Sequence, residues 1–282
     1  MAPHPIRITL VCENTAAGAG VLGEHGLAWW IETGDRRVLF DTGQGLTLTH
    51  NARHLGIDLS TADAIVLSHG HYDHVGGLPD VLPLAPECPV WLHPAALGEK
   101  YSRGAEGRAR RISTPLLDEQ KLAPIQPRLR WLAERAEVVP GVFATGQIPR
   151  LTGFEDTGGA FYLDEELRVP DPIDDDLALA IPVRDGVVVV LGCAHAGVVN
   201  TLDFVAPWLG PVAVVMGGMH LLHAGRARLQ ATAHALRRHA IRSLGPNHCT
   251  GDEAVAFLHH EFPGRCFPAH VAMNWSFLPP QR

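Results

Sequence analysis

The sequence of 282 residues has few cysteines, and their arrangement does not suggest a small disulfide-linked or zinc-ribbon domain. Their number is odd and no two form a CxxC pair, as their positions show: Cys12, Cys88, Cys193, Cys249 and Cys266. A run of about 18 or more apolar residues is also missing, so we expect no membrane span. The first residues contain no long apolar stretch. We therefore expect no signal peptide, and a cytoplasmic protein with reduced thiols.

Several nucleotide-binding and catalytic patterns are missing as well. The sequence holds no GxGxxG and no GxxxxGK(S/T) stretch, so dinucleotide and P-loop sites have no support. It holds no GxSxG, which disfavours a serine hydrolase. The net charge of −7 disfavours a general nucleic-acid binder, because such a protein needs a basic surface. We expect a small-molecule substrate, no nucleic acid and no membrane as partner, and we leave a homo-oligomer open.

The composition favours a folded protein and points to metal chemistry. Hydrophobic residues make up 46% of the chain and charged residues 19%, which supports a sizeable core and disfavours global disorder. The 17 histidines are more than a core needs. Since imidazole is a common metal ligand, this excess raises the expectation of a metal site.

Apolar periodicity predicts strands and helices along the whole chain. In the first half we predict a helix at 46–55 and strands at 6–12, 27–32, 37–40, 64–67 and 89–92. In the second half we predict helices at 198–209, 226–241 and 253–262 and strands at 177–181, 187–191, 212–216 and 243–244. Two strand-rich halves with helices outside predict an α/β fold, an αββα sandwich in a single domain over residues 1–282.

Residues 93–140 differ from the rest, because they are rich in Arg, Pro and Gly and have little periodicity. We interpret them as an insertion that covers or flanks the functional site, with a possible short helix at 129–135. An ordinary surface excursion explains the same pattern equally well.

Three histidines and an aspartate fall within six residues, directly after the predicted buried strand at 64–67: His69, His71, Asp73 and His74. Zinc, iron and manganese all accept imidazole nitrogen and carboxylate oxygen. Residues two apart on an extended chain point the same way, so His69 and His71 are placed to hold one ion. Asp73 and His74 then face a second ion. The alternative is a surface histidine cluster without metal.

This segment carries the HxHxDH signature, and the chain resembles members of the metallo-β-lactamase superfamily. It is similar to one subgroup, which includes dihydropterin–ribofuranosylaminobenzene-phosphate synthases, in these further stretches: 24–27, 39–44, 51–52, 55–58, 192–197 and 248–251. The resemblance implies the αββα fold of that superfamily. It also implies one or two divalent metal ions, with zinc preferred to iron or manganese. The signature is specific for the fold and says little about the substrate.

The superfamily takes further ligands from later in the chain. The resemblance implies His195 as the third ligand of the first ion; the alternative is a turn histidine that caps the next helix. It implies His248 as the ligand that completes the second ion, with a structural role as the alternative. His220 also follows a predicted strand, and it remains open as a ligand, a substrate donor or a loop residue.

Two departures from the superfamily pattern stand out. Many members carry a bridging aspartate at a strand end where this chain has Cys193. Either Cys193 is a soft ligand or the bridge is missing, with Asp176 as an outside candidate. Many relatives also carry a histidine in the turn that corresponds to 141–150, and this chain has none there, so His195 would take that role.

Three further residues are candidates for supporting roles. Asp41 follows the strand at 37–40, and the resemblance implies that it fixes the tautomer of a ligand histidine; a helix cap is the alternative. His25 is a candidate for substrate binding at the mouth of the site, or for a structural turn. Arg150 is a candidate for a bidentate contact with an anionic substrate, or an exposed arginine without a role.

We therefore expect a metal-dependent hydrolase that uses a metal-activated water on a small ester, lactone, thioester or phosphoester. Asp73 is both a ligand and the expected catalytic residue, because it would orient that water. One alternative is a metal-dependent transferase that condenses a pterin diphosphate with an aryl ribose phosphate. Another is a metal-binding sensor without catalysis.

Overall fold

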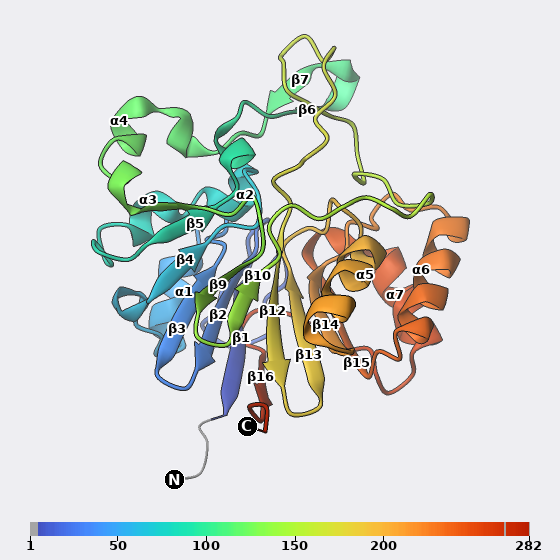
Figure 1. Cartoon of the computed structure of the whole chain (residues 1–282). Coiled ribbons are helices and arrows are strands. Elements are labelled where there is room, and N and C mark those ends of the chain that lie inside the picture. Colours follow the sequence, from blue (N-terminus) through green and yellow to red (C-terminus); the bar gives the residue numbers. More distant parts are fainter. Residues whose placement is uncertain (1–4, 268, 282) are drawn as a thin grey trace.

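Two large β-sheets form the centre of the computed structural model, which describes residues 5–267 and 269–281 (Figure 1). The first sheet has seven strands in the order β16-β1-β2-β3-β4-β5-β8. In that order the strands are Asn274–Phe277, Ile6–Cys12, Ala28–Thr33, Arg36–Phe40, Ala64–Val66, Val90–Leu92 and Leu129–Trp131. β1, β2 and β3 pair antiparallel, whereas β3, β4, β5 and β8 run parallel to one another.

The second sheet has six strands in the order β15-β14-β13-β12-β10-β9. In that order the strands are Ser243–Asn247, Val212–Gly218, Gly186–Leu191, Ala178–Val183, Val142–Ala144 and Ala136–Val139. β13, β14 and β15 are parallel, and β12 pairs antiparallel with β13. The sequences of these parallel strands are almost entirely apolar because the first sheet covers one face of this part of the sheet and helices cover the other.

Helices cover the outer face of each sheet. On the first sheet they are α1 (Leu48–His54), α2 (Tyr72–Val75), α3 (Leu78–Val81) and α4 (Glu119–Leu122). On the second they are α5 (Val198–Leu209), α6 (Arg226–Arg238) and α7 (Asp252–Glu261). Short 3-10 turns lie at Leu59–Thr61, Pro94–Leu97, Ala105–Gly107, Pro115–Leu117, Gln126–Arg128 and His248–Thr250. Among the described residues no helix has the length and apolar character needed to cross a bilayer.

The main core lies between the two sheets. Its buried side chains include Trp29 and Phe40 from the first sheet and Leu179 and Val190 from the second. Two further apolar clusters fill the spaces between each sheet and its helices. The architecture is therefore the predicted αββα sandwich, with its four layers visible in Figure 1.

Most of the predicted elements are confirmed. Helix α5 has the predicted bounds because Gly197 and Gly210, at φ of 103° and 105°, begin and end it in conformations that side chains rarely adopt. The helix predicted at 129–135 is wrong: Leu129–Trp131 is strand β8, which pairs with β5. Pairing at the open edge of a parallel sheet outweighs the weak helical pattern of so short a segment.

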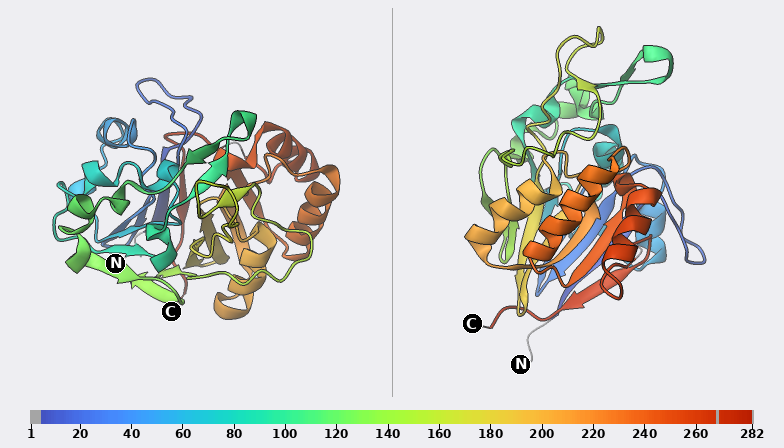
Figure 2. Two further views of the ribbon diagram at one scale, coloured as in Figure 1. Left: turned by 90° about the horizontal axis from the view of Figure 1, so that it is seen from above. Right: turned by 90° about the vertical axis from the view of Figure 1, so that its right-hand side faces the viewer.

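The segment 93–140 is only partly outside the sandwich, because its end supplies the edge strands β8 and β9. Its middle supplies two strands, β6 and β7, of a separate three-stranded sheet with the order β11-β6-β7, whose third strand comes from beyond residue 140. These strands are Phe161–Tyr162 (β11), Tyr101–Arg103 (β6) and Ala109–Arg111 (β7). Figures 1 and 2 show this small sheet above the end of the sandwich that lies opposite the two termini.

The same end of the sandwich collects the carboxyl ends of the parallel strands. β3 and β4 end there in the first sheet, and β13, β14 and β15 end there in the second. Ligand sites in open α/β sheets form at the carboxyl ends of strands. The loops that follow these five strands carry most of the predicted site residues.

Candidate metal centre

The first group of candidate ligands contains His69, His71 and His195. His69 Nε2 lies 3.0 Å from His71 Nδ1. The ring of His195 lies 4.9 Å from that of His69 and 5.0 Å from that of His71. The exposed fractions of the three residues are 0%, 4% and 0%. One ligand atom from each lies within 4.8 Å of the other two, as a shared metal ion requires.

Neighbouring groups fix the orientation of these rings. His69 Nδ1 lies 2.9 Å from Ser68 Oγ, and His195 Nδ1 lies 2.8 Å from the carbonyl oxygen of Thr157. Since a carbonyl only accepts, His195 Nδ1 carries the proton and Nε2 keeps its lone pair. Gly70 packs so closely that a Cβ there would lie 2.3 Å from the carbonyl oxygen of Ala96, so only glycine fits between the first two histidines.

The second group gathers around Asp73. Asp73 Oδ2 lies 3.3 Å from His25 Nε2, 3.4 Å from His248 Nε2 and 3.8 Å from His74 Nε2. The ligand group around Asp73 contains His25 and His248, whereas His74 lies 3.8 Å away and joins a different group with His69 and Cys193. Burial alone would raise the pKa of Asp73, but the neighbouring histidines, led by His74, outweigh it and hold that pKa well below its usual value. Asp73 is therefore ionised at neutral pH.

Asp41 is buried beneath the histidines. Its Oδ2 lies 2.7 Å from His74 Nδ1, and its two oxygens also accept hydrogen bonds from the backbone N–H and the hydroxyl of Ser68. Burial opposes a charge on His74, but Asp41 and then Asp73 outweigh it and raise the pKa of His74 to about 9. The structure places Asp41 as the acceptor behind a candidate ligand. It does not show the alternative of a helix cap, because α1 begins only at Leu48.

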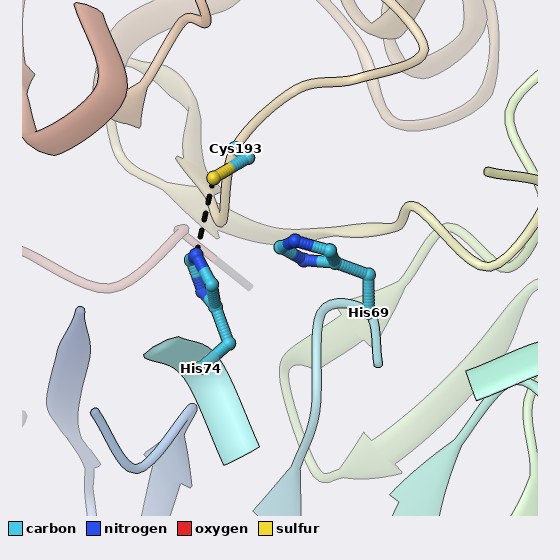
Figure 3. A group of neighbouring side chains, drawn as sticks. All are labelled: His69, His74 and Cys193. Atoms are coloured by element: carbon cyan, nitrogen blue, oxygen red, sulfur yellow. Dashed lines mark hydrogen bonds between the residues drawn. The ribbon is translucent and has the colours of Figure 1, made fainter. Parts of the chain in front are cut away.

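A third group contains Cys193, His220 and Cys249. Cys193 Sγ lies 3.1 Å from His74 Nε2, and Figure 3 shows these two side chains with the ring of His69 pointing toward them. The rings of His220 and His195 are 4.2 Å apart. Burial raises the pKa of the Cys193 thiol well above its usual value. Cys193 belongs to two candidate ligand groups, one with His69 and His74 and the other with His220 and Cys249.

The turns that present these side chains are strained. Ala194, His220 and His248 have φ of 52°, 43° and 50°, in the left-handed region that glycine prefers. Such conformations cost about 1–3 kcal/mol each and tend to gather at functional sites. The chain adopts them at the ends of β13, β14 and β15, where the bend turns the following side chains inward.

Buried imidazole nitrogens without a hydrogen-bond partner support metal binding here. Among the described residues these nitrogens include Nε2 of His71, His195 and His248 and Nδ1 of His220. Burial is the main cause that lowers the pKa of His71, to about 3, and that of His195, so both rings are neutral at pH 7. A neutral buried imidazole with a free lone pair is a ready metal ligand, whereas an unsatisfied buried nitrogen is otherwise costly. The residues present thus fit the divalent ions that the resemblance implies.

A cavity of about 430 Å³ opens onto the three groups. Its walls outside the candidate ligands are partly apolar and include Tyr72, Ile112, Phe161 and Leu222. Arg110 also lines it and donates a hydrogen bond of 2.7 Å to the Tyr72 hydroxyl. Since Arg110 and Ile112 belong to the segment 93–140, that segment flanks the mouth of the site.

Two candidates from the sequence do not face the ligand groups as anticipated. Arg150 does not line the cavity in the described structure, and its guanidinium donates to the carbonyl oxygens of His195 and Pro172. In this structure Arg150 fixes the turn that carries His195, and its contact with an anionic substrate stays a prediction. Asp176 joins none of the ligand groups found in the described part of the chain, and its Oδ2 accepts from the Ala196 N–H at 2.8 Å.

Sequence reasoning missed residues that orient the ligands. Asn14 Oδ1 lies 2.8 Å from His248 Nδ1, and Asn14 Nδ2 lies 3.4 Å from His25 Nδ1. The position of Asn14 in the sequence could have indicated a role at the site, because Asn14 follows strand β1, which ends at the same edge of the sheet as β3. Cys249 stands next to His248 in the sequence, but nothing in its local pattern indicates that it reaches Cys193.

Comparison with known proteins agrees with this geometry. Residues 22–203 match the family model of the metallo-β-lactamase superfamily. The chain is 30% identical over 274 residues to a Methanocaldococcus jannaschii protein named 7,8-dihydropterin-6-methyl-4-(β-D-ribofuranosyl)-aminobenzene-5′-phosphate synthase, covering 91% of this chain and 92% of that one. The chain belongs to the metallo-β-lactamase superfamily, and the resemblance to the subgroup with such synthases is confirmed.

Solved structures agree on the fold. A metal-dependent hydrolase of the β-lactamase superfamily superposes with a TM-score of 0.81 and 29% identity, covering 96% of this chain and 98% of that one. Zinc-bound PqqB from Methylobacterium extorquens superposes with a TM-score of 0.59 at 14% identity, covering 95% and 99% of the two chains. At that identity the second comparison shows the fold alone.

Proposed function

We propose that this chain is a metal-dependent hydrolase of a small ester, lactone, thioester or phosphoester. The observation that carries the proposal is that His69, His71 and His195 converge, as do Asp73, His25 and His248, beside a cavity of about 430 Å³. The similarity to a solved metal-dependent hydrolase over nearly the whole chain supports it. Zinc is the first choice of ion, with iron or manganese as alternatives for such nitrogen and oxygen donors.

Divalent ions held by the two histidine-containing groups would lower the pKa of a bound water towards about 7 and polarise the oxygen of the scissile bond. His69, His71 and His195 would hold one ion. Asp73, with His248 and either His74 or His25, would hold the other.

Asp73 is placed to act in the chemistry itself. Its carboxylate is ionised and reaches the cavity, so it can accept a hydrogen bond from the attacking water and orient it toward the substrate. The partly apolar walls would take up the apolar part of a substrate. Arg110 is the cation at the mouth that could meet an anionic group.

A second candidate function rests on the synthase relative. The 30% identity over 91% of this chain favours a transferase that condenses a pterin diphosphate with an aryl ribose phosphate. In that reaction the ions would assist departure of the diphosphate, and no water would attack.

Substrate profiling separates these functions. Protein purified without added metal is analysed for its metal content. It is then loaded with zinc, manganese or iron and assayed against simple esters, lactones, thioesters and phosphodiesters, and against the pterin pair. Turnover of the simple substrates, lost in His71→Ala and retained in the exposed control His234→Ala, supports the hydrolase. Turnover of the pterin pair alone supports the transferase. A metal-loaded protein that turns over none of them contradicts both, and leaves the metal-binding sensor.

A further inference from the structure

Two thiols and an imidazole meet on one wall of the cavity. Cys193 follows β13, His220 follows β14, and Cys249 lies in the 3-10 turn His248–Thr250 that follows β15. Their ligand atoms all lie within 4.8 Å of one another, and all three residues line the cavity. Three adjacent parallel strands thus each deliver one donor to the same point.

The absence of a side chain at Gly218 leaves space for the sulfur of Cys249 at the end of strand β14. A Cβ on Gly218, the last residue of β14, would lie only 2.6 Å from Cys249 Sγ. Glycine at this position therefore lets the sulfur approach the end of β14. Any larger residue would push Cys249 away from Cys193 and His220.

The imidazole of His220 supplies an independent indication of a ligand. Its Nδ1 is buried and has no hydrogen-bond partner in the described part of the structure. Because a buried polar atom left unpaired is destabilising, its retention indicates a partner that binds there. His220 belongs to neither of the two groups assigned above to the hydrolytic ions.

We infer that Cys193, His220 and Cys249 form a separate binding position for one thiophilic divalent ion. Thiolate donors favour softer ions than the imidazole and carboxylate donors around Asp73 do. Two cysteines and a histidine leave a fourth coordination position for a ligand, and all three residues line the cavity from which such a ligand could come. Each thiol that binds the ion loses its proton to solvent. Through this position the protein would bind a thiol-seeking metal, or a ligand on that metal, beside the hydrolytic centre.

A competing arrangement uses Cys193 differently. Cys193 Sγ also lies near His69 and His74, and these three form a ligand group of their own (Figure 3). In that arrangement Cys193 would replace the bridging carboxylate, and Cys249 would bind no metal. The two arrangements therefore differ in the number of sulfur ligands, which is two in the first and one in the second.

Cadmium is a suitable probe because it favours thiolate ligands. One equivalent is added to the full-length protein after removal of other metals, and X-ray absorption at the cadmium edge counts the sulfur neighbours. We expect two sulfurs in the unmodified protein and in the control Cys88→Ser, whose thiol is buried in the helix-covered cluster of the first sheet. We expect one sulfur in Cys193→Ser and in Cys249→Ser.

Each alternative outcome overturns the inference. One sulfur that disappears in Cys193→Ser and persists in Cys249→Ser assigns the ion to the competing arrangement. A cadmium ion with nitrogen and oxygen neighbours alone excludes any thiolate position. If a variant does not fold, the sulfur count of the unmodified protein still decides between two and fewer. The test reads metal ligands and not turnover, so it can fail while the proposed hydrolase stands, and the reverse.

Discussion

Lys100 is the residue whose replacement tests most directly how the loop that carries His69 and His71 is held. Its side chain is 1% exposed. Its Nζ donates hydrogen bonds of 2.9 Å to Asp171 and 2.8 Å to Asp175. The other oxygen of Asp175 accepts from the Gly70 N–H at 2.7 Å, between the histidines of the first group. One buried ammonium thus links the segment 93–140 to the loop that carries His69 and His71.

We predict that Lys100→Met lowers the free energy of unfolding by about 3–5 kcal/mol, because it leaves two buried carboxylates without their cation. For a chain of 282 residues this corresponds to a fall in Tm of about 5–8 °C. Burial alone would lower the pKa of Lys100, but Asp175 and Asp171 outweigh it and raise that pKa. The loss should therefore be complete below the ordinary lysine pKa of 10.5, and should shrink only as pH rises through the raised value.

Thermal and urea unfolding followed by circular dichroism measure this loss. Arg111→Met is the matched control, because Arg111 pairs with Glu99 at 2.8 Å in the same segment while both side chains are about half exposed. An exposed pair contributes about 0–1 kcal/mol, so the control should change little. If Lys100→Met costs no more than Arg111→Met, then the buried triad does not hold the loop and the reasoning is refuted.

Three further predictions concern the metal centre. The variant His71→Ala should lose its bound metal, measured by elemental analysis, and its catalytic activity, whereas the control His234→Ala, at an exposed position, should keep both. If His71→Ala keeps its metal and its activity, the site assignment is refuted. Asp41→Asn should weaken metal affinity by about 10–100-fold with an unchanged circular dichroism spectrum, because the carboxylate behind His74 is lost. Unchanged affinity would show that His74 is not a ligand. Because the pKa of His74 is raised to about 9, metal binding at pH 7 should release at least one proton, and fewer protons as the pH rises through 9. Calorimetry in buffers of different ionisation enthalpy measures the number of protons released. No proton release at pH 7 contradicts the assignment of His74 as a ligand.

The sequence alone was sufficient to predict the layers of the fold and to single out the histidine segment of the candidate site. Alternating and continuous apolar runs predict most strands because burial on one or both faces of a sheet leaves that pattern in the chain. The segment from His69 to His74 holds four candidate metal ligands within six residues. It can be recognised without tertiary information because local geometry brings these ligands together. The one helix predicted in error, at 129–135, became β8 because a neighbouring strand was available for pairing.

Only the tertiary structure decided which distant residues complete the site. Cys249 approaches Cys193 because β13, β14 and β15 lie side by side in the second sheet, an order that no local pattern reveals. Arg150 looks like an anion-binding residue in the sequence, yet its guanidinium holds backbone carbonyls of the His195 turn. Lys100 is buried because Asp171 and Asp175 pair with its ammonium group, and the sequence does not reveal this contact. Local patterns record burial and periodicity, whereas contacts between loops depend on how the whole chain closes around them.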